Sequence, residues 1–598
     1  MFGCWTTSGL SRLASRGTFC REMHLNRPHT PKAYKVCDGL TEALIYFLVV
    51  FTPWAFGTTQ QWSIWTANAA GYLLGCSLVT KWLIRWRTGY APSRWGESVR
   101  EDQTKDQGRG SVDRSQKAGV RRQKAEDRGK VGGGPKSMDH GPGASEDTGQ
   151  RAGGGGRGPG KWLTRILAAL TVFILLYCLI GALNPRATYY EPDRRFEYHD
   201  NYIEWLPHSY DPASTWQAFW SYLSLAFFFW GTRDWLLAKT SKEKRLATGE
   251  HRSDRHEELR LRAFGHSSSM KGGEAQRSDN PISNPLPDRL RRLLWVLCIN
   301  GTILALVGIL QRLSGTGKLL WLIEPRFNKT NDVQFGPYAY RSNGATYFNL
   351  VWPVCVGLWL SLLRRGADMR RLGVRLGQGS HVLLLPCTAL MAAAPVISTA
   401  RGAGLIALGN IIITAGILFI STRRDGPTIR ATMLSLFLAV LTLAGVLGWQ
   451  QLAARLEMMF VDKMSTRTEV YRNSRVIAEE YPVLGTGPGS FGTIYRLYKE
   501  PTQTWDAYAH DDWLELKITF GWIGFGAICL MLVIALARWF GSSGIPLRWD
   551  FVGLIWVAIT GCLVHAKFDF PFQIYSLHLL FLLLCSILFC SSRASSEP

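Results

Sequence analysis

Repeated apolar runs of about 20 residues constrain this chain more than any other feature. A run of that length crosses the hydrocarbon core of a bilayer as a helix, because 20 helical residues rise about 30 Å. The sequence therefore predicts an all-α, polytopic membrane protein with a large helical loop ahead of its last three spans. We count about twelve runs in the 598 residues, beginning near Leu40, Ser63, Trp162, Trp216, Leu290, Gly344, His381, Gly402, Arg430, Asp512, Asp550 and Ile574.

The charges between the runs predict how the chain crosses the bilayer. Lysine and arginine favour the cytoplasmic side. In a twelve-span topology the basic segments all fall on one side, so both termini are expected in the cytoplasm. These segments are the leader 1–39, the linkers 87–161 and 239–289, and the turns 364–375 and 423–430. The large loops expected on the opposite side are 184–215, 314–343 and 450–511.

The linkers divide the chain into parts. Both are of low complexity, and their composition predicts disordered tethers. No apolar signal-peptide core precedes the first span, which is therefore expected to act as the insertion signal. The predicted order is a leader at 1–39, two spans at 40–86, a linker at 87–161, two spans at 162–238, a linker at 239–289 and a membrane domain at 290–592.

The formal net charge of +23 would suggest a nucleic-acid partner in a soluble protein. Here the positive residues lie between spans and no aromatic-interleaved basic fold is visible, so we expect no nucleic acid. The 12 cysteines lie in the leader or in apolar runs and form no CxxC pair. Scattered histidines likewise lack metal-ligand spacing, so the sequence predicts neither a metal site nor a cofactor.

Three arginines lie near the predicted outer ends of spans. Arg401 and Arg341 each stand at the mouth of a span, and Arg467 lies in the late loop. A single arginine in such a place more often reaches to the interface than binds a ligand. Three guanidinium groups that converged would form a site for a pyrophosphate, since guanidinium binds phosphate through paired hydrogen bonds.

His510 lies at the junction between the late loop and the next span, followed by Asp511 and Asp512. An imidazole can accept a proton at neutral pH, so His510 is a candidate general base. The alternative is a histidine that only completes a helix end, with one of the two carboxylates as the helix cap. His565, in the segment HAKFDFPF, is a second and weaker candidate.

The segment GTGPGSF, residues 485–491, looks like a phosphate-binding loop. No Lys-Ser/Thr pair follows it and no strand precedes it, so a nucleotide site is rejected and a tight turn is expected instead. Upstream, 468–480 has helical spacing, with Val470, Ser474 and Ile477 on one face.

These elements together resemble the O-antigen ligase and O-antigen polymerase superfamily over about 290–588. In the late loop the resemblance rests on Arg467, Tyr471, Pro482, Gly485, Gly487, Gly489 and Phe491. After the loop it rests on His510, Asp511, Leu514, Gly521 and Gly524, and upstream on Arg401, Arg341, Gly344 and Asn349. Two positions depart from the family pattern: Asp511 stands where Asn is commoner, and the Asn349 region lacks Asn-Pro-Asn.

The resemblance implies a metal-independent, inverting glycosyltransferase of the bacterial inner membrane. It would move a glycan from undecaprenyl pyrophosphate to a hydroxyl on the periplasmic face, where the acceptor is a saccharide, the lipid A core or a protein. His510 would then be the base, and Arg341, Arg401, Arg467 and Asp511 would bind substrate. Ligase, repeat-unit polymerase and protein O-oligosaccharyltransferase remain alternatives. A transporter of lipid-linked saccharides is an alternative of another class, and scarce mid-span charges favour the enzyme.

Overall fold

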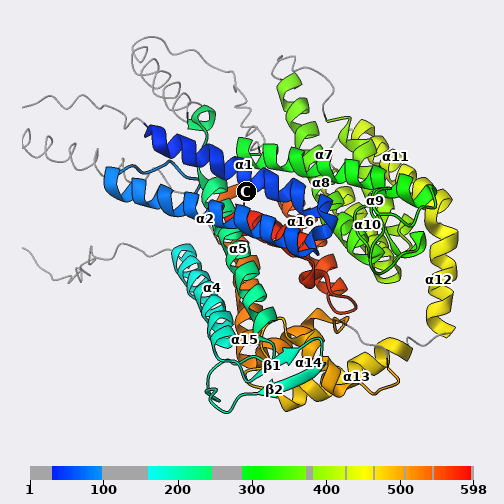
Figure 1. The fold of residues 1–598 in the computed structure, drawn as a ribbon. Helices are drawn as coiled ribbons and strands as arrows, with labels where there is room; N and C mark the ends of the chain where they lie inside the picture. The colour runs from blue at the N-terminus through cyan, green and yellow to red at the C-terminus, as the bar shows by residue number, and fades with distance from the viewer. Residues whose placement is uncertain are drawn as a thin grey trace, which may run out of the picture.

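The structure is a computed structural model that describes residues 30–96, 159–244, 286–371, 381–423, 427–461, 465–503, 507–541 and 544–593. The predicted leader through residue 29 and the greater part of both predicted linkers, 97–158 and 245–285, lie outside the described residues. Figure 1 shows a bundle of long helices with one small hairpin and two short helices gathered at one end.

Helices account for most of the described chain. The helices are α1 (Lys32–Trp54), η1 (Phe56–Thr58), α2 (Gln61–Thr88), α4 (Pro159–Leu183), α5 (Pro212–Leu237), α7 (Asp288–Leu313), η2 (Asn331–Val333), α8 (Arg341–Arg371), α9 (Leu384–Ile397), α10 (Arg401–Ser421), α11 (Pro427–Ala444), η3 (Gly445–Trp449), α12 (Gln450–Val461), α13 (Ser465–Glu480), α14 (Phe491–Tyr498), α15 (Asp512–Ala537), η4 (Arg538–Phe540), α16 (Trp549–His565), η5 (Pro571–Gln573) and α17 (Tyr575–Cys590).

The strands are few and short. An antiparallel hairpin joins β1 (Ala187–Tyr190) to β2 (Arg195–Tyr198), and a parallel pair joins β3 (Ile545–Leu547) to β4 (Ser591–Arg593). The prediction of an all-α, polytopic membrane protein is confirmed, and the hairpin is an addition that it did not contain. Its strands alternate side chains over only four residues each, which is too short a pattern to stand out in a sequence.

The apolar runs form helices as expected. Among the described residues, seven helical segments are long and apolar enough to cross a membrane: α1, α4, α7, α8, α10, the continuous α11–α12 and α15. Three shorter apolar helices, α9, α16 and α17, occupy further predicted spans. The spans predicted near Ser63 and Trp216 are also helical, as α2 and α5.

One boundary differs from the prediction. The late loop was expected to begin at residue 450, but α11 continues through a π-helical turn at 445–449 into α12 and ends only at Val461. The candidate span in this region accordingly covers Ile429–Glu457. Leucine, alanine and methionine in α12 favour the helix, so the apolar run and its amphipathic continuation form one element.

The predicted outer loops meet at one end of the bundle. The amide of Tyr210, in loop 184–215, donates to the carbonyl of Thr486 in the late loop at 3.1 Å. Asp332, in loop 314–343, forms an ion pair with Arg455 of α12 at 2.8 Å. Figure 1 shows β1, β2, α13 and α14 together at this end.

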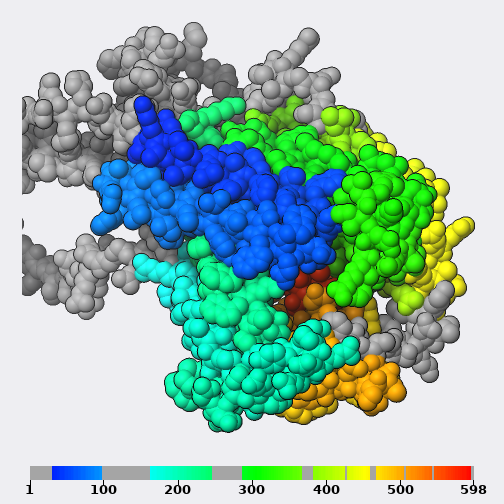
Figure 2. Space-filling view, viewed as in Figure 1, coloured from blue at the N-terminus to red at the C-terminus, as the bar shows by residue number. Residues whose placement is uncertain are grey.

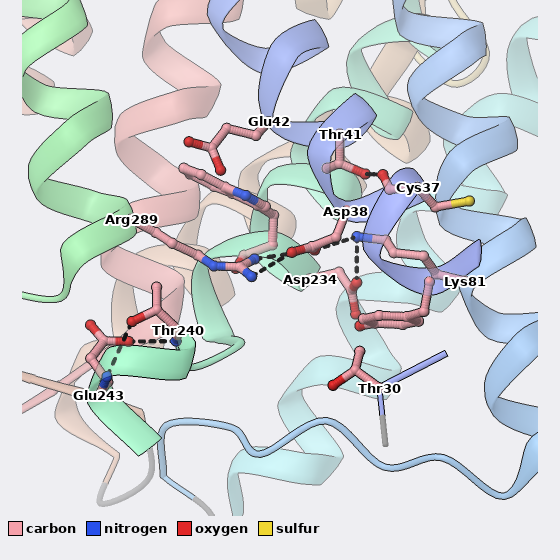
Figure 3. Close-up of polar contacts among 12 residues, drawn as sticks. Thr30, Cys37, Asp38, Thr41, Glu42, Lys81, Asp234, Thr240, Glu243 and Arg289 are labelled. Atoms are coloured by element: carbon pink, nitrogen blue, oxygen red, sulfur yellow. Dashed lines mark hydrogen bonds and ion pairs between the residues drawn. The ribbon is translucent and has the colours of Figure 1, made fainter. Parts of the chain in front are cut away.

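The N-terminal helices are held to the rest by buried ion pairs. Lys81 of α2 lies 3.0 Å from Asp234 of α5 and 3.6 Å from Asp38 of α1, and Arg289 of α7 lies 2.5 Å from Asp38. Figure 3 shows Lys81 between the two carboxylates. In Figure 2, α1 and α2 lie over the face of the bundle turned to the viewer.

Candidate active site

The glycine-rich turn of the late loop sits against a break in α15. Gly521 has φ +58° and interrupts the helix, which frees backbone groups that a continuous helix would pair internally. The turn satisfies several of them: Thr486 N donates to Ile518 O at 2.9 Å, and Trp522 N donates to Pro482 O at 2.7 Å. The positive φ angles of Gly485, Gly487 and Gly489 confirm the predicted tight turn.

The loop helix α13 packs on this turn through its apolar face. Val470, Ser474 and Ile477 are all buried, as their predicted common face requires. Arg467 lies in the first turn of α13. The fold therefore fixes Arg467 relative to the start of α15, where His510 lies.

The three predicted arginines line one cavity of about 1270 Å³. Arg341 is the first residue of α8, Arg401 is the first residue of α10, and Arg467 stands in the first turn of α13. Each therefore lies at a helix N-terminus, where backbone amides and the helix dipole also favour an anion. The structure brings together the three guanidinium groups that the sequence left 60 or more residues apart.

Neighbouring groups hold two of these arginines in place. Arg467 donates to the carbonyl of Phe568 at 2.8 Å and to the hydroxyl of Tyr340 at 3.3 Å. Arg341 contacts the backbone carbonyl of Asp332 and lies 3.7 Å from its carboxylate. Burial disfavours the charged form of Arg467, but Tyr340 and Asp569 outweigh that effect and raise the pKa of Arg467.

His510 adjoins the cavity but is not one of the residues that line it. Its Nδ1 lies 3.5 Å from the carboxylate of Asp569, and its side chain is 19% exposed. The ring packs edge-on against Phe570, and the backbone carbonyl accepts a hydrogen bond from the hydroxyl of Tyr471 at 3.0 Å. A φ of +53° at His510 turns the ring at the point where the loop enters α15.

Asp569 joins the two candidate histidines. Its second carboxylate oxygen lies 3.6 Å from Nε2 of His565 and accepts from Ser342 at 2.5 Å, while Thr346 contacts Nδ1 of His565 at 2.6 Å. Burial would raise the pKa of Asp569, but His510, His565 and Arg467 lower it to about 2. A buried carboxylate thus stays ionised beside His510.

Sequence reasoning placed Asp569 near His565 without giving it a role. The contact with His510 joins segments 59 residues apart, and no local pattern reports it. The sequence feature that could have indicated a role for Asp569 is its position four residues after His565, at the end of a predicted span.

Asp511 is placed at the helix start rather than at the cavity wall. Its carboxylate accepts from the amide of Leu514 at 3.2 Å, which caps α15, and it forms an ion pair with Lys567 at 2.5 Å. Asp511 is not among the residues that line the cavity. Its predicted part in substrate binding stays a prediction.

Away from the arginines and Asp569, the cavity is long and mostly apolar. It follows α10 through Leu405 and Ile413, and it follows α16 from His565 back to Trp549, where Trp539 also lines it. The 17 residues of α16 correspond to a length of about 25 Å. One cavity thus combines a cationic mouth with a slot suited to a hydrocarbon chain.

In the parts of the chain that the structure describes, no group of three or more His, Cys, Asp or Glu residues is arranged to hold a metal ion.

Fold and site together define a multi-pass helical membrane protein with a cationic cavity at one end of the bundle. The O-antigen ligase family model matches residues 386–531. That segment contains Arg401, Arg467 and His510, and the match supports membership of the O-antigen ligase superfamily, as the resemblance predicted. The match supports a membrane glycosyltransferase of the ligase or polymerase type. No curated protein matches the chain.

Proposed function

We propose that the protein transfers a glycan from undecaprenyl pyrophosphate to a hydroxyl acceptor on the periplasmic face of the bacterial inner membrane. One observation carries the proposal: Arg341, Arg401 and Arg467 line a single cavity that continues between α10 and α16 along a mostly apolar wall. A lipid diphosphate has the matching chemistry, since its charged group can meet the guanidinium groups while its hydrocarbon chain lies between α10 and α16.

The proposed reaction exchanges one bond at the anomeric carbon of the donor sugar. The acceptor oxygen forms a bond to that carbon, the bond from the carbon to the pyrophosphate oxygen breaks, and undecaprenyl pyrophosphate leaves. The acceptor proton passes to His510, whose Nδ1 faces Asp569 and whose Nε2 is left for the hydroxyl. The ionised Asp569 stabilises the imidazolium that forms.

The arginines act on the leaving group. Negative charge grows on the pyrophosphate as the glycosidic bond breaks, and fixed guanidinium groups stabilise it without having to reorganise. The N-termini of α8 and α10 add backbone amides to the same region. His510 reaches solvent while the arginines line the cavity, so acceptor and donor can approach from different sides.

The central test replaces the proposed base. Wild type, His510→Ala and the control His199→Ala are reconstituted into proteoliposomes with an undecaprenyl-pyrophosphate glycan and an acceptor. His199 lies in the hairpin next to Thr188, away from the cavity. We expect His510→Ala to lose about 10²–10⁴-fold in transfer rate and His199→Ala to retain it. Wild-type transfer by a well-folded His510→Ala would refute the assignment.

The same preparations distinguish glycan transfer from the alternative functions. A transporter of lipid-linked saccharides needs no base, so it would move labelled donor across the bilayer equally well in wild type and His510→Ala. Offering lipid A core, a second donor unit or a peptide hydroxyl in parallel distinguishes ligase, polymerase and protein O-oligosaccharyltransferase. We expect the lipid A core to be the preferred acceptor, as the O-antigen ligase match suggests.

A further inference from the structure

A second, apolar groove lies between α4, α5, α15 and α17. Its cavity measures about 190 Å³, and its walls include Leu175, Trp230, Leu532 and Leu582. At about 30 Å³ each, on the order of six water-sized groups fill such a space. The groove therefore has room for a stretch of one hydrocarbon chain and is too small for a helix, which with its side chains is about 10 Å across.

Arg233 stands at one end of this groove. Its guanidinium carbon lies 5.6 Å from the ring centre of Trp230, which lines the groove, and 5.5 Å from that of Phe589 on α17. Arg233 is near the C-terminal end of α5, whereas the candidate active site adjoins the start of α15. Arg233 is therefore about a helix length from the candidate active site, on the order of 35 Å, and the groove runs between them, since Trp513 and Phe572 also line it.

The charge of Arg233 has no anionic partner among the described residues. The guanidinium donates no hydrogen bond and forms no ion pair there, and its Nε is buried without a partner. The adjacent carboxylate of Asp234 is already contacted by Lys81, Arg85 and Arg94 at 3.0, 2.8 and 2.6 Å. Arg94 and Arg538 oppose the charge of Arg233, and Asp234 favours it.

An arginine at the edge of the hydrocarbon region normally has an anionic partner, since an unpaired guanidinium away from water is costly. Basic pockets between membrane helices are suited to anionic lipid headgroups. We propose that this groove holds one acyl chain of an anionic glycerophospholipid, whose phosphate binds Arg233. The headgroup position at Arg233 lies in the leaflet opposite the candidate active site. The proposal does not depend on the proposed glycan transfer.

Native mass spectrometry of the purified full-length chain tests the proposal. The protein in detergent is titrated with phosphatidylglycerol and, separately, with phosphatidylcholine of the same acyl chains. We expect one molecule of phosphatidylglycerol to bind wild type at least about tenfold more tightly than phosphatidylcholine, because a net negative headgroup complements the local charge. Equal binding of the two lipids would overturn the assignment of an anionic lipid.

Variants locate the bound lipid. Arg233→Gln should weaken phosphatidylglycerol binding about tenfold or more, whereas Arg195→Gln, an exposed arginine of the hairpin, should not change it. Ala226→Phe fills the groove and should weaken binding of both lipids, which keeps the test decisive if Arg233→Gln fails to fold. Wild-type affinity for phosphatidylglycerol in Arg233→Gln or in Ala226→Phe would refute the site. If millimolar inorganic phosphate alone displaced the lipid, the site would bind phosphate without an acyl chain, and the proposal of a lipid site would be wrong.

Discussion

At the residue scale, the sequence identified charged groups but not their partners. Arg341, Arg401 and Arg467 could be chosen because an arginine near the hydrocarbon region usually has an anionic partner, and the structure places all three on one cavity. Asp569 could not be chosen in the same way, because its importance comes from contacts with His510 and His565. Such contacts between distant segments exist only after the helices have packed.

Asp569→Asn should reduce transfer and change the acid stability of the protein. Without the carboxylate, the imidazolium of His510 loses its counter-charge, and we expect the turnover rate to fall about 10²-fold. The lowered pKa of Asp569, about 2 against an ordinary 3.8, means that the carboxylate stabilises the fold above pH 4. Wild type should therefore lose roughly 2 kcal/mol between pH 4 and 2.

Thermal unfolding in detergent across that pH range provides the measurement for Asp569. The asparagine variant should show no such loss from this group, because its side chain does not titrate. Parallel pH profiles for wild type and variant would contradict the assignment. A transfer rate unchanged by the substitution would remove Asp569 from the mechanism.

Arg467 should tolerate lysine better than alanine. Arg467→Lys keeps a positive charge at the cavity but loses the planar fork that binds phosphate in two places, whereas Arg467→Ala loses both. We expect KM for the lipid donor to rise in the order wild type, lysine, alanine. Steady-state kinetics at varied donor concentration measure this order, and equal KM values for alanine and wild type would exclude a donor contact.

At the scale of elements, the break in α15 positions the late loop. The sequence predicted a glycine-rich turn and a helix at 468–480, and both are present. It could not predict that the turn pairs with the backbone of α15 around Gly521. Hydropathy reports how deep a segment lies, but it contains no information on which loop satisfies the backbone of a broken helix.

Gly521→Ala should separate the loop from the helix. A Cβ there would lie 2.2 Å from the carbonyl oxygen of Val483 at a φ of +58°, so the turn must move. Gly526→Ala in the same helix is the matched control, because a Cβ at that position meets nothing within 4 Å. We expect Gly521→Ala to lower Tm in detergent by several degrees and to expose the loop to protease.

The control should show neither change. Because the loop carries Arg467, the loss of loop docking in Gly521→Ala should also reduce glycan transfer. Equal Tm and equal protease resistance in the two alanine variants would show that the turn does not depend on the break in α15.

At the scale of the whole molecule, the N-terminal helices are part of the bundle although they lie outside the matched segment 386–531. Trp54 of α1 donates to Asn300 of α7 at 2.8 Å, and Ser224 of α5 lies at 2.8 Å from the hydroxyl of Tyr575 on α17. The sequence predicted four spans in this region but not how they attach. Attachment also uses the ion pair between Arg289 of α7 and Asp38 of α1, whose members are 251 residues apart, whereas Lys81 with Asp234 joins α2 to α5 within the N-terminal region.

Asp234→Ala should weaken the packing of α2 against α5 more than Lys81→Met does. Removing Asp234 leaves Lys81, Arg85 and Arg94 without the carboxylate they share, and breaking a buried pair in this way costs about 3–5 kcal/mol. Lys81→Met leaves Asp234 paired with both arginines, so its cost should be smaller. Asp193→Ala, at an exposed position, should be neutral.

Unfolding in detergent with increasing denaturant measures the stability of the three variants. Equal stability of Asp234→Ala and Asp193→Ala would show that these ion pairs do not hold α2 to α5.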